Sequence, residues 1–342
     1  MDQRSVKIYK WKDLKTIHNQ IYNNNKLLTP YQSYEFLSKI KLGKNDRNPF
    51  ETFGYKEQNF VLFDEKEQPL AIAPFYSKKK NGKYNVLFRG YVSSAGHLDF
   101  IYKSNFSYDD YIYMMNEIKK YYKTGIINFD RISEKSSIYK YALQEKKFHM
   151  ESSVLVTIKL PSEYDEWFSG LSKSVRQNVR TSYNRMKKDG IDFNYLLYYE
   201  EAPQGKTEKD IVKLFSRRLC DHSKINSKFV EKVLYYLKRK HPMTLGIIKH
   251  PKYVGATLYI EDKLAAYFEG FITNDNRILV PRLSINIDYG RYSPGGILIN
   301  ETMKKIINDK KISEFDLQRG DEPYKYSYGG VEYQNFEWKY EF

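Results

Sequence analysis

The segment GDEPYKYSYGG, residues 320–330, gathers acids, tyrosines and a lysine directly after the short apolar run SEFDLQ. Loops that follow buried strands often carry catalytic side chains in α/β folds. A carboxylate can accept a proton during a reaction, and a tyrosine can donate one. We therefore take four residues of this loop as candidates for catalysis: Asp321, Glu322, Tyr324 and Lys325.

A second candidate site lies where RYSPGG leads into the amphipathic run ILINETMKKIIND. Proline suits the first turn of a helix, and free N–H groups at a helix start attract anions. The two glycines leave the backbone open to a ligand; equally, they could serve tight packing in an ordinary strand-to-helix turn. On the first interpretation this junction binds a phosphate-bearing group through Arg291, Tyr292, Ser293, Gly295, Gly296 and Ile297.

A third feature is the segment Ser172–Lys188, which has six Lys and Arg residues and no acid. Apolar residues recur every fourth position from Trp167 to Tyr183, as expected for a helix with one packed face. The basic stripe beside them would suit an anionic substrate, although such stripes are commonly only solvated. The candidate substrate-binding residues here are Arg176, Asn178 and Arg180, joined by Asp316 and Arg319 near the tyrosine-rich loop.

Glu269 lies between aromatic residues in the strand-like run YFEGF. A carboxylate in such apolar surroundings is either paired, with Arg282 as the nearest suitable partner in sequence, or functional with a raised pKa. Both alternatives stay open, and Glu269 joins the catalytic candidates as a base. His97 could serve as a base in the first half, but a lone loop histidine is more often structural.

These candidates need a scaffold, and the hydrophobic pattern predicts an α/β order that occurs twice. In each half a strand and two helices precede a meander of strands, a helix and a short buried strand. We expect one long helix over residues 162–188 and a strand over residues 243–250. The predicted domains are 1–150 and 151–330, with a terminal strand, 331–342, that packs back on the first.

The amino-acid composition of the chain limits the classes of partner that it is expected to bind. The formal net charge of +15 favours an anionic partner such as nucleic acid, a phosphorylated cofactor, a nucleotide sugar or an acidic membrane face. Residues suited to metal sites are scarce, since there is a single cysteine and the six histidines lack ligand spacing, so we expect no metal. No apolar run long enough for a membrane span and no signal peptide are visible, which predicts a cytoplasmic protein.

The order of strand, RYSPGG, helix and FDLQRGDEPYKYSYGG resembles the GNAT acyltransferase superfamily, specifically its CelD-type, FemAB-like branch of tandem-GNAT proteins. The basic segment LSKSVRQNVRTSYNRMKKDGIDF is similar to the helix that precedes the second GNAT unit in that branch. This resemblance covers most of residues 160–330. It implies a mixed α/β fold with two tandem GNAT-like domains, the first of them degenerate.

The resemblance also implies chemistry: an amine attacks the activated acyl group of acyl-CoA directly, in a ternary complex. Lys325 would then contact a phosphate or the developing negative charge, against the alternative of a lysine that only supports a turn. The usual Arg/Gln-x-x-Gly-x-Gly/Ala loop is matched at Gly296, whereas Pro294 stands where the first glycine belongs.

We therefore predict an N-acyltransferase that uses acyl-CoA and an amine on a cell-envelope or polysaccharide precursor, with a small-molecule or nucleotide-linked acceptor held in the cleft between the domains. One alternative is a Fem-like transferase that takes its aminoacyl group from tRNA and extends a peptidoglycan precursor. Another is a non-catalytic basic module that binds RNA or an anionic surface. Peripheral membrane contact fits each of the three.

Overall fold

The computed structural model describes residues 3–40, 53–91, 95–145, 148–224 and 227–342. The chain forms two compact units. Unit 1 comprises Met1–Val154 and Tyr333–Phe342, and unit 2 comprises Leu155–Glu332. Among the described residues no helix combines the length and the apolar character needed to cross a membrane.

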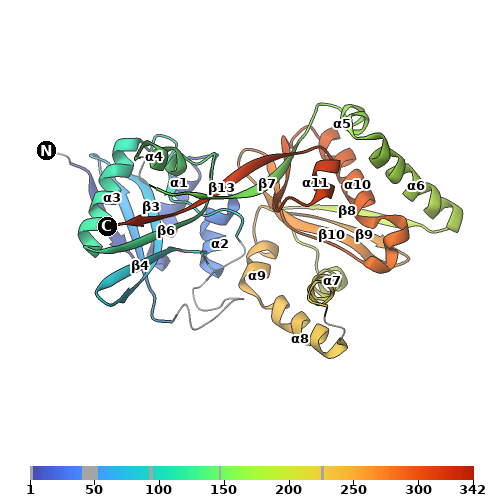
Figure 1. The fold of residues 1–342 in the computed structure, drawn as a ribbon, viewed down its shortest axis with the longest axis horizontal. Coiled ribbons are helices and arrows are strands. Elements are labelled where there is room, and N and C mark those ends of the chain that lie inside the picture. Colours follow the sequence, from blue (N-terminus) through green and yellow to red (C-terminus); the bar gives the residue numbers. More distant parts are fainter. Residues whose placement is uncertain (1–2, 41–52, 92–94, 146–147, 225–226) are drawn as a thin grey trace. The chain divides into compact units, whose positions relative to one another are not determined.

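Unit 1 is built on a mixed sheet in which β1, β2, β3 and β4 form an antiparallel meander. β4 then pairs in parallel with β6, since α3 carries the chain back across the sheet (Figure 1). The elements of the first repeat, in chain order, are β1 (Ser5–Tyr9), α1 (Lys15–Tyr22), α2 (Tyr34–Lys39), β2 (Lys56–Phe63), β3 (Pro69–Lys80), β4 (Lys83–Phe88), β5 (Ile101–Tyr102), α3 (Tyr108–Tyr122), β6 (Gly125–Ser133) and α4 (Ser137–Glu145), followed by β7 (Glu151–Lys159), which enters unit 2 at Leu155.

Unit 2 repeats this plan. β8, β9, β10 and β11 form the meander, and α10 connects β11 to its parallel neighbour β12. The elements of the second repeat, in chain order, are α5 (Tyr164–Gly170), α6 (Lys173–Asp189), β8 (Phe193–Tyr199), α7 (Lys206–His222), α8 (Lys228–Arg239), α9 (Pro242–Ile248), β9 (Tyr253–Ile260), β10 (Lys263–Ile272), β11 (Arg277–Ile285), the 3₁₀ turn Ile287–Tyr292, α10 (Pro294–Asn308), β12 (Glu314–Arg319) and α11 (Pro323–Ser327), followed by β13 (Gly330–Glu341), most of which belongs to unit 1.

The last strand of each repeat pairs with the sheet of the other repeat. β7 follows the first repeat in sequence but pairs antiparallel with β12, through registers such as Ile158 with Phe315. β13 follows the second repeat and pairs antiparallel with β6, where Trp338 lies opposite Phe129. The chain therefore exchanges equivalent strands between its two sequence repeats, which is the arrangement expected of a duplicated chain.

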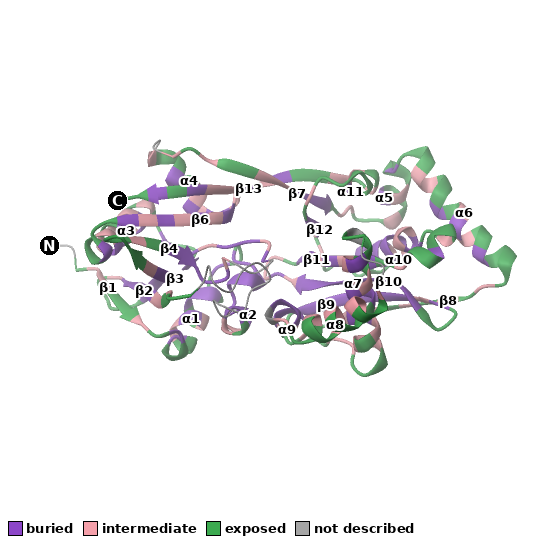
Figure 2. Cartoon of the chain, turned by 60° about the horizontal axis from the view of Figure 1, so that its bottom comes forward, coloured by how far each residue is buried: buried purple, intermediate pink, exposed green. Residues whose placement is uncertain are grey.

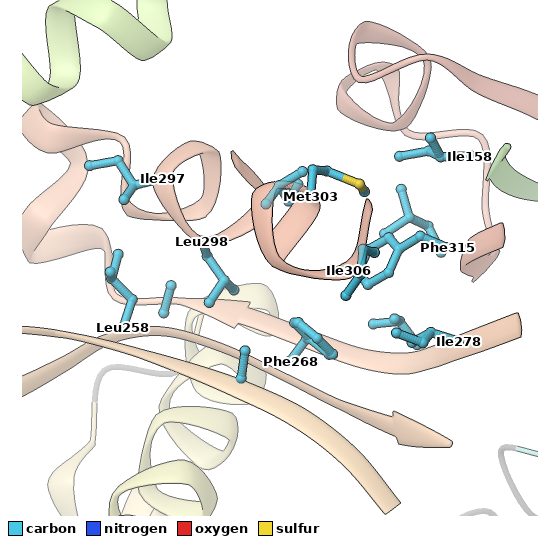
Figure 3. Packing of buried hydrophobic residues seen from close by; sticks show 14 of the residues in the cluster. Ile158, Leu258, Phe268, Ile278, Ile297, Leu298, Met303, Ile306 and Phe315 are labelled. Carbon is cyan, nitrogen blue, oxygen red and sulfur yellow. The ribbon is translucent and has the colours of Figure 1, made fainter. Parts of the chain in front are cut away.

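The core that positions the site lies between the unit 2 sheet and α10 (Figure 3). Ile297 and Leu298 at the start of α10 pack toward Leu258 and Phe268, while Ile306 near its end contacts the Phe315 region. Burial of such side chains typically contributes about 1.5–3 kcal/mol each. Because Ile297 lies in this core, the first turn of α10 is fixed against the sheet.

Two elements differ from the sequence prediction. The expected long helix over residues 162–188 is two helices, because the chain turns extended at Leu171 and Ser172 then caps α6 by accepting the Val175 N–H. The expected strand over residues 243–250 is mostly helix α9. Its start is explained by Pro242 in the first turn and by His241, whose Nδ1 accepts the Met243 N–H at 3.2 Å.

Candidate active site

The start of α10 is sharply formed. Ser293 adopts a left-handed conformation, with φ of 47°, and its carbonyl accepts the N–H groups of both Gly296 and Ile297. Pro294 has no N–H, and the N–H of Gly295 has no hydrogen-bond acceptor among the described residues. An anion at this helix start would therefore meet the helix dipole and one free backbone donor, at Gly295.

Both glycines of this turn make room for neighbouring side chains. A Cβ at Gly296 would lie 2.7 Å from the hydroxyl oxygen of Tyr328, and one at Gly295 would lie 3.0 Å from Ile285 Cγ2. Real Cβ contacts are essentially never as short as the first of these. The glycine at position 296 therefore lets the phenol of Tyr328 reach the start of α10.

Tyr328 is the residue that this site gains beyond the sequence candidates. Its ring stacks on Trp167 with 6.4 Å between ring centres, and its carbonyl accepts the Trp167 indole N–H at 3.2 Å. Its hydroxyl has no hydrogen-bond partner among the described residues, and burial raises its pKa. The sequence signal was the YGG motif, in which Gly329, with φ of 88°, lets the chain turn after the tyrosine.

Arg291 and Tyr292, both predicted to bind the donor, are tied to the end of α6. Arg291 lies 3.1 Å from the Asp189 carboxylate, and the Tyr292 hydroxyl donates to Asp189 at 2.9 Å. The hydrogen bond to Asp189 raises the pKa of Tyr292. Arg185 adds a hydrogen bond to the Arg291 carbonyl at 3.0 Å. Ile297 is fully buried, so only its backbone can take part in a site.

The β11–β12 ladder ends early. The parallel pairing runs from Arg277 and Glu314 only as far as Leu279 and Asp316. Pro281, two residues further on, cannot donate a ladder hydrogen bond. On β12, the pairing with β7 shifts register between Asp316 and Arg319, and Asp316 accepts the Gln318 N–H at 2.8 Å. Asp316 is fully buried, whereas Arg319 is exposed.

Lys325 holds the turn between β12 and α11. Its Nζ donates to the carbonyl oxygens of Gln318, Arg319 and Gly320 at 3.1, 2.8 and 3.0 Å. It also lies 3.0 Å from the Glu322 carboxylate, and the side chain is only 2% exposed. These contacts occupy all three ammonium hydrogens. Lys325 thus organises the loop, and it offers no free donor to a ligand in this arrangement.

The same turn presents an acid and a phenol beside a cation from α7. Burial opposes ionisation of Glu322, but the hydrogen bond and charge of Lys325 outweigh it and lower the pKa of Glu322. Burial raises the pKa of Tyr324 to about 12; the Glu322 charge adds to this and Arg218 opposes it. Arg218 donates to the carbonyl of Leu283 on β11. Asp321 is exposed at the tip of the turn.

Glu269 is buried on the other face of β10 from α10. Phe268 packs in the α10 core, and side chains alternate along a strand, so Glu269 faces α7. It lies opposite Arg282 in the β10–β11 register, with 3.8 Å between the charged groups. Burial raises the pKa of Glu269 to about 7, and Arg282 only partly offsets this rise. Glu269 thus has Arg282 beside it and also a raised pKa, and its role as a base stays a prediction.

The α6 candidates divide into structural and exposed groups. Arg176 donates to the carbonyls of Ser169 and Leu171, at 2.6 Å for the latter, and so closes the turn between α5 and α6. Arg180 lies over the ring of Phe168, 5.6 Å from its centre, and is exposed, as is Asn178. Among the described residues, no group of three or more His, Cys, Asp or Glu side chains is placed to hold a metal ion.

The predicted residues therefore fall into separate groups. The start of α10 brings Ser293, Gly295 and Gly296 together with Tyr328. The β12–α11 turn joins Lys325 to Glu322. It also carries Tyr324, whose pKa is raised by burial, a rise that the charge of Arg218 opposes. Glu269 and Arg282 lie on the α7 face of the sheet. Arg291, Tyr292 and Arg176 are engaged in contacts that fix the ends of α6.

Residues 249–326 match the family described as the acetyltransferase (GNAT) domain. This match runs from the start of β9 to α11, so it includes the turn into α10 and most of the tyrosine-rich loop. No curated protein sequence matches the chain.

Two solved structures share the fold over nearly the whole chain. FemX superposes with a TM-score of 0.60 at 8% identity, covering 99% of this chain and 97% of that one. A conserved protein of unknown function from Bacteroides thetaiotaomicron VPI-5482 gives a TM-score of 0.51 at 11% identity, with 99% of both chains covered. The chain thus has a GNAT/FemAB-like fold, and the predicted mixed α/β fold with two GNAT-like domains is confirmed.

Proposed function

We propose that this chain, with its GNAT/FemAB-like fold, is an N-acyltransferase that moves an acyl group from acyl-CoA to an amine. The observation that carries the proposal is the GNAT match over residues 249–326, because it includes both the α10 start and the tyrosine-bearing loop. The free N–H of Gly295 lies in the first turn of that helix, and the unpartnered hydroxyl of Tyr328 approaches the same turn at Gly296. The Gly295 N–H can bind an anion, and the Tyr328 hydroxyl can donate a proton.

The donor would bind with its phosphates at the start of α10. The helix dipole and the Gly295 N–H favour negative charge there. Arg291 could add a cation if it leaves Asp189, because its side chain is 64% exposed. The proline at position 294 removes one backbone donor, so this loop would hold the phosphates with fewer N–H groups than a glycine there would provide.

Proton transfer would be divided between a tyrosine and a carboxylate. The raised pKa keeps Tyr328 protonated at neutral pH, as a general acid for the leaving thiolate must be. Tyr324, with its pKa near 12, is the alternative acid. Glu269, with a pKa of about 7, has the strength expected of a general base. Because Glu269 is buried on the α7 face of β10, opposite the α10 start, it would take the amine proton only through a chain of water molecules.

The acceptor class rests on the resemblance to CelD-type and FemAB-like proteins, which implies an amine on a cell-envelope or polysaccharide precursor. Exposed cations on α6, among them Arg180, would suit a phosphorylated or nucleotide-linked form of it. Lys325 would act as a positioning residue, because it fixes the loop that carries Tyr324 and Tyr328.

A second candidate is aminoacyl transfer from tRNA, as the resemblance to Fem peptidyltransferases implies. The fold match to FemX and the net charge of +15 favour this alternative. Both donors present an activated acyl group to an amine, so the same acid and base would serve either reaction.

Two measurements separate these functions. Acetyl-CoA and longer acyl-CoAs at 100 times their dissociation constants should stabilise the protein by about 2.7 kcal/mol in thermal unfolding. Turnover of acyl-CoA with amine acceptors should survive ribonuclease. Turnover that needs charged tRNA and stops with ribonuclease would establish the tRNA donor. Strong, salt-sensitive RNA binding without any stabilisation by acyl-CoA would instead support a non-catalytic basic module.

A further inference from the structure

Helix α8 carries an apolar ridge that faces solvent. Phe229, Val233, Tyr236 and Leu237 are 75%, 40%, 56% and 61% exposed. Their spacing of four, three and one residues places all four on one arc of the helix. No residue of α8 is fully buried, and Figure 2 shows the helix without buried colouring. Large side chains clustered in this way usually mark an interaction surface.

Basic residues border this ridge. Lys228 and Lys232 precede Phe229 and Val233 in sequence and lie on the neighbouring arc, one turn apart, both exposed. Lys238, Arg239 and Lys240 follow at the end of the helix, and Glu231 is the single acid within α8. Arg239 is partly engaged by Glu208 of α7, with 3.8 Å between the charged groups. The exposed face of α8 is therefore apolar along its middle and cationic along one side.

The opposite face of α8 attaches the helix to unit 2. Val230, Leu234 and Tyr235 are partly buried, and α8 packs mainly on α7. Ser227 caps the helix start by accepting the Val230 N–H. The ridge is thus presented by a helix that is already folded and anchored, so binding through it needs no refolding.

We propose that the exposed face of α8 docks the protein on an anionic lipid surface. A folded helix with aromatic and leucine side chains on one face and lysines beside them lies in the interface of a membrane, with the apolar side chains among the acyl chains and the lysines at the headgroups. The net charge of +15 strengthens attraction to anionic lipid over the same surface. This docking is separate from acyl transfer and does not require that activity.

A second copy of the chain is a poorer occupant. Stable protein interfaces use about 20–30 residues a side, far more than four side chains on one helix. Two α8 ridges placed together would also bring their lysine rows close, and like charges at an interface oppose association. An anionic surface instead complements both the apolar ridge and the lysines.

Flotation with lipid vesicles tests the proposal on the full chain. Vesicles of phosphatidylglycerol and phosphatidylcholine at a ratio of one to three should bind the protein, and phosphatidylcholine alone should bind it weakly. The double variant Phe229→Ser with Leu237→Ser should reduce binding at least about tenfold, because about two large apolar side chains no longer enter the bilayer. Leu143→Ser on α4, where the leucine is 48% exposed, is the matched control and should bind normally.

Charge is tested with variants of equal net change. Lys228→Glu with Lys232→Glu should reduce vesicle binding more than about tenfold, since each lysine near an anionic surface adds about fivefold to binding. Lys80→Glu with Lys83→Glu, at the exposed tip of the β3–β4 hairpin, changes the net charge by the same amount and should reduce binding less than about threefold. Equal losses from the two pairs would mean that net charge alone drives binding, which would overturn the proposal.

Tryptophan fluorescence measures whether the ridge on α8 enters the bilayer. The three native tryptophans are buried, so Tyr236→Trp adds an exposed reporter on the ridge. Its emission should shift to shorter wavelength with anionic vesicles and should be quenched by brominated lipid. No shift and no flotation would overturn the proposal. So would self-association in solution that Phe229→Ser with Leu237→Ser abolishes, because the ridge would then bind a second copy.

Discussion

The hydroxyl of Tyr328 lies 2.7 Å from the point where a Cβ of residue 296 would be, so that the phenol and the first turn of α10 share one small space. Tyr328 follows α11 in sequence, while Gly296 lies in the first turn of α10. The contact between Tyr328 and Gly296 joins the SPGG junction to the tyrosine-rich loop, the two segments that the sequence predicts to carry the site. The contact can also be tested, because Gly296 and Tyr328 can be substituted separately.

Gly296→Ala should destabilise the protein by about 1–3 kcal/mol, since the added methyl group overpacks against the Tyr328 hydroxyl. In a Tyr328→Phe background the same change should be neutral or stabilise by up to about 1 kcal/mol. The nearest remaining atoms, Ser293 Cβ and Tyr328 Cζ, are at 3.9 and 4.0 Å, and alanine favours a helix over glycine. Urea unfolding of the four proteins measures the coupling. Equal effects in both backgrounds would contradict the contact.

Tyr328→Phe should lower kcat about 100-fold with the free energy of unfolding changed by less than about 1 kcal/mol, because the hydroxyl donates a proton but makes no hydrogen bond to a described residue. Tyr324→Phe is the matched comparison, since Tyr324 lies in the same tyrosine-rich loop and also has a raised pKa. Steady-state kinetics with acyl-CoA give the answer. A large loss in Tyr324→Phe with normal activity in Tyr328→Phe would transfer the acid role to Tyr324.

Lys325→Met should destabilise the protein by about 3 kcal/mol or more. The substitution leaves three carbonyls and the Glu322 carboxylate without their cation at a buried position. Lys310→Met is the control, because its ion pair with Glu163 is exposed on both sides and should contribute less than about 1 kcal/mol. Urea midpoints compare the two. Full stability of Lys325→Met with lost turnover would show a direct catalytic role instead.

Glu269 makes stability depend on pH in a defined direction. Its pKa is raised from 4.5 to about 7, so between these values the folded protein holds a proton that the unfolded chain releases. This contribution to stability is present below pH 4.5 and is lost as the pH rises through 7.

Glu269→Gln removes the titration. The variant should therefore gain stability relative to the parent between pH 5 and pH 8, by an amount on the order of 1–3 kcal/mol. Urea unfolding at both pH values measures it. Glu163→Gln, at an exposed site, should show no such trend. A relative gain toward low pH would mean that the Arg282 pairing dominates and lowers the pKa.

Much of the fold could be predicted from the sequence because its signals are local. The alternating and helical patterns identify most strands and helices, and the similarity of the two halves predicts the repeated plan. Helix α9 could not be told from a strand by its apolar pattern because the run is short, and only Pro242 and the His241 cap distinguish it. The break at Leu171 is not visible in the sequence pattern because the apolar four-residue spacing continues across it.

The sequence predicts which segments form the candidate site better than it predicts which side chains in them meet. SPGG and YKYSYGG are marked by composition, but which tyrosine reaches α10 depends on packing between segments about 30 residues apart. Likewise, the sequence shows that Lys325 is near carboxylates but not that it turns inward to three carbonyls. The direction of these side chains depends on how segments distant in the sequence pack together.

The exchange of β7 and β13 has a consequence for biosynthesis. A ribosome makes the chain from its N-terminus, so β6 emerges long before β13, the strand that pairs with it from Asn335 onward. During that interval β6 lacks its β13 neighbour, and unpaired strand edges promote aggregation. Unit 2 receives β7 before any of its own strands and can complete its sheet first. In the cell, the second half of this chain can therefore mature ahead of the first.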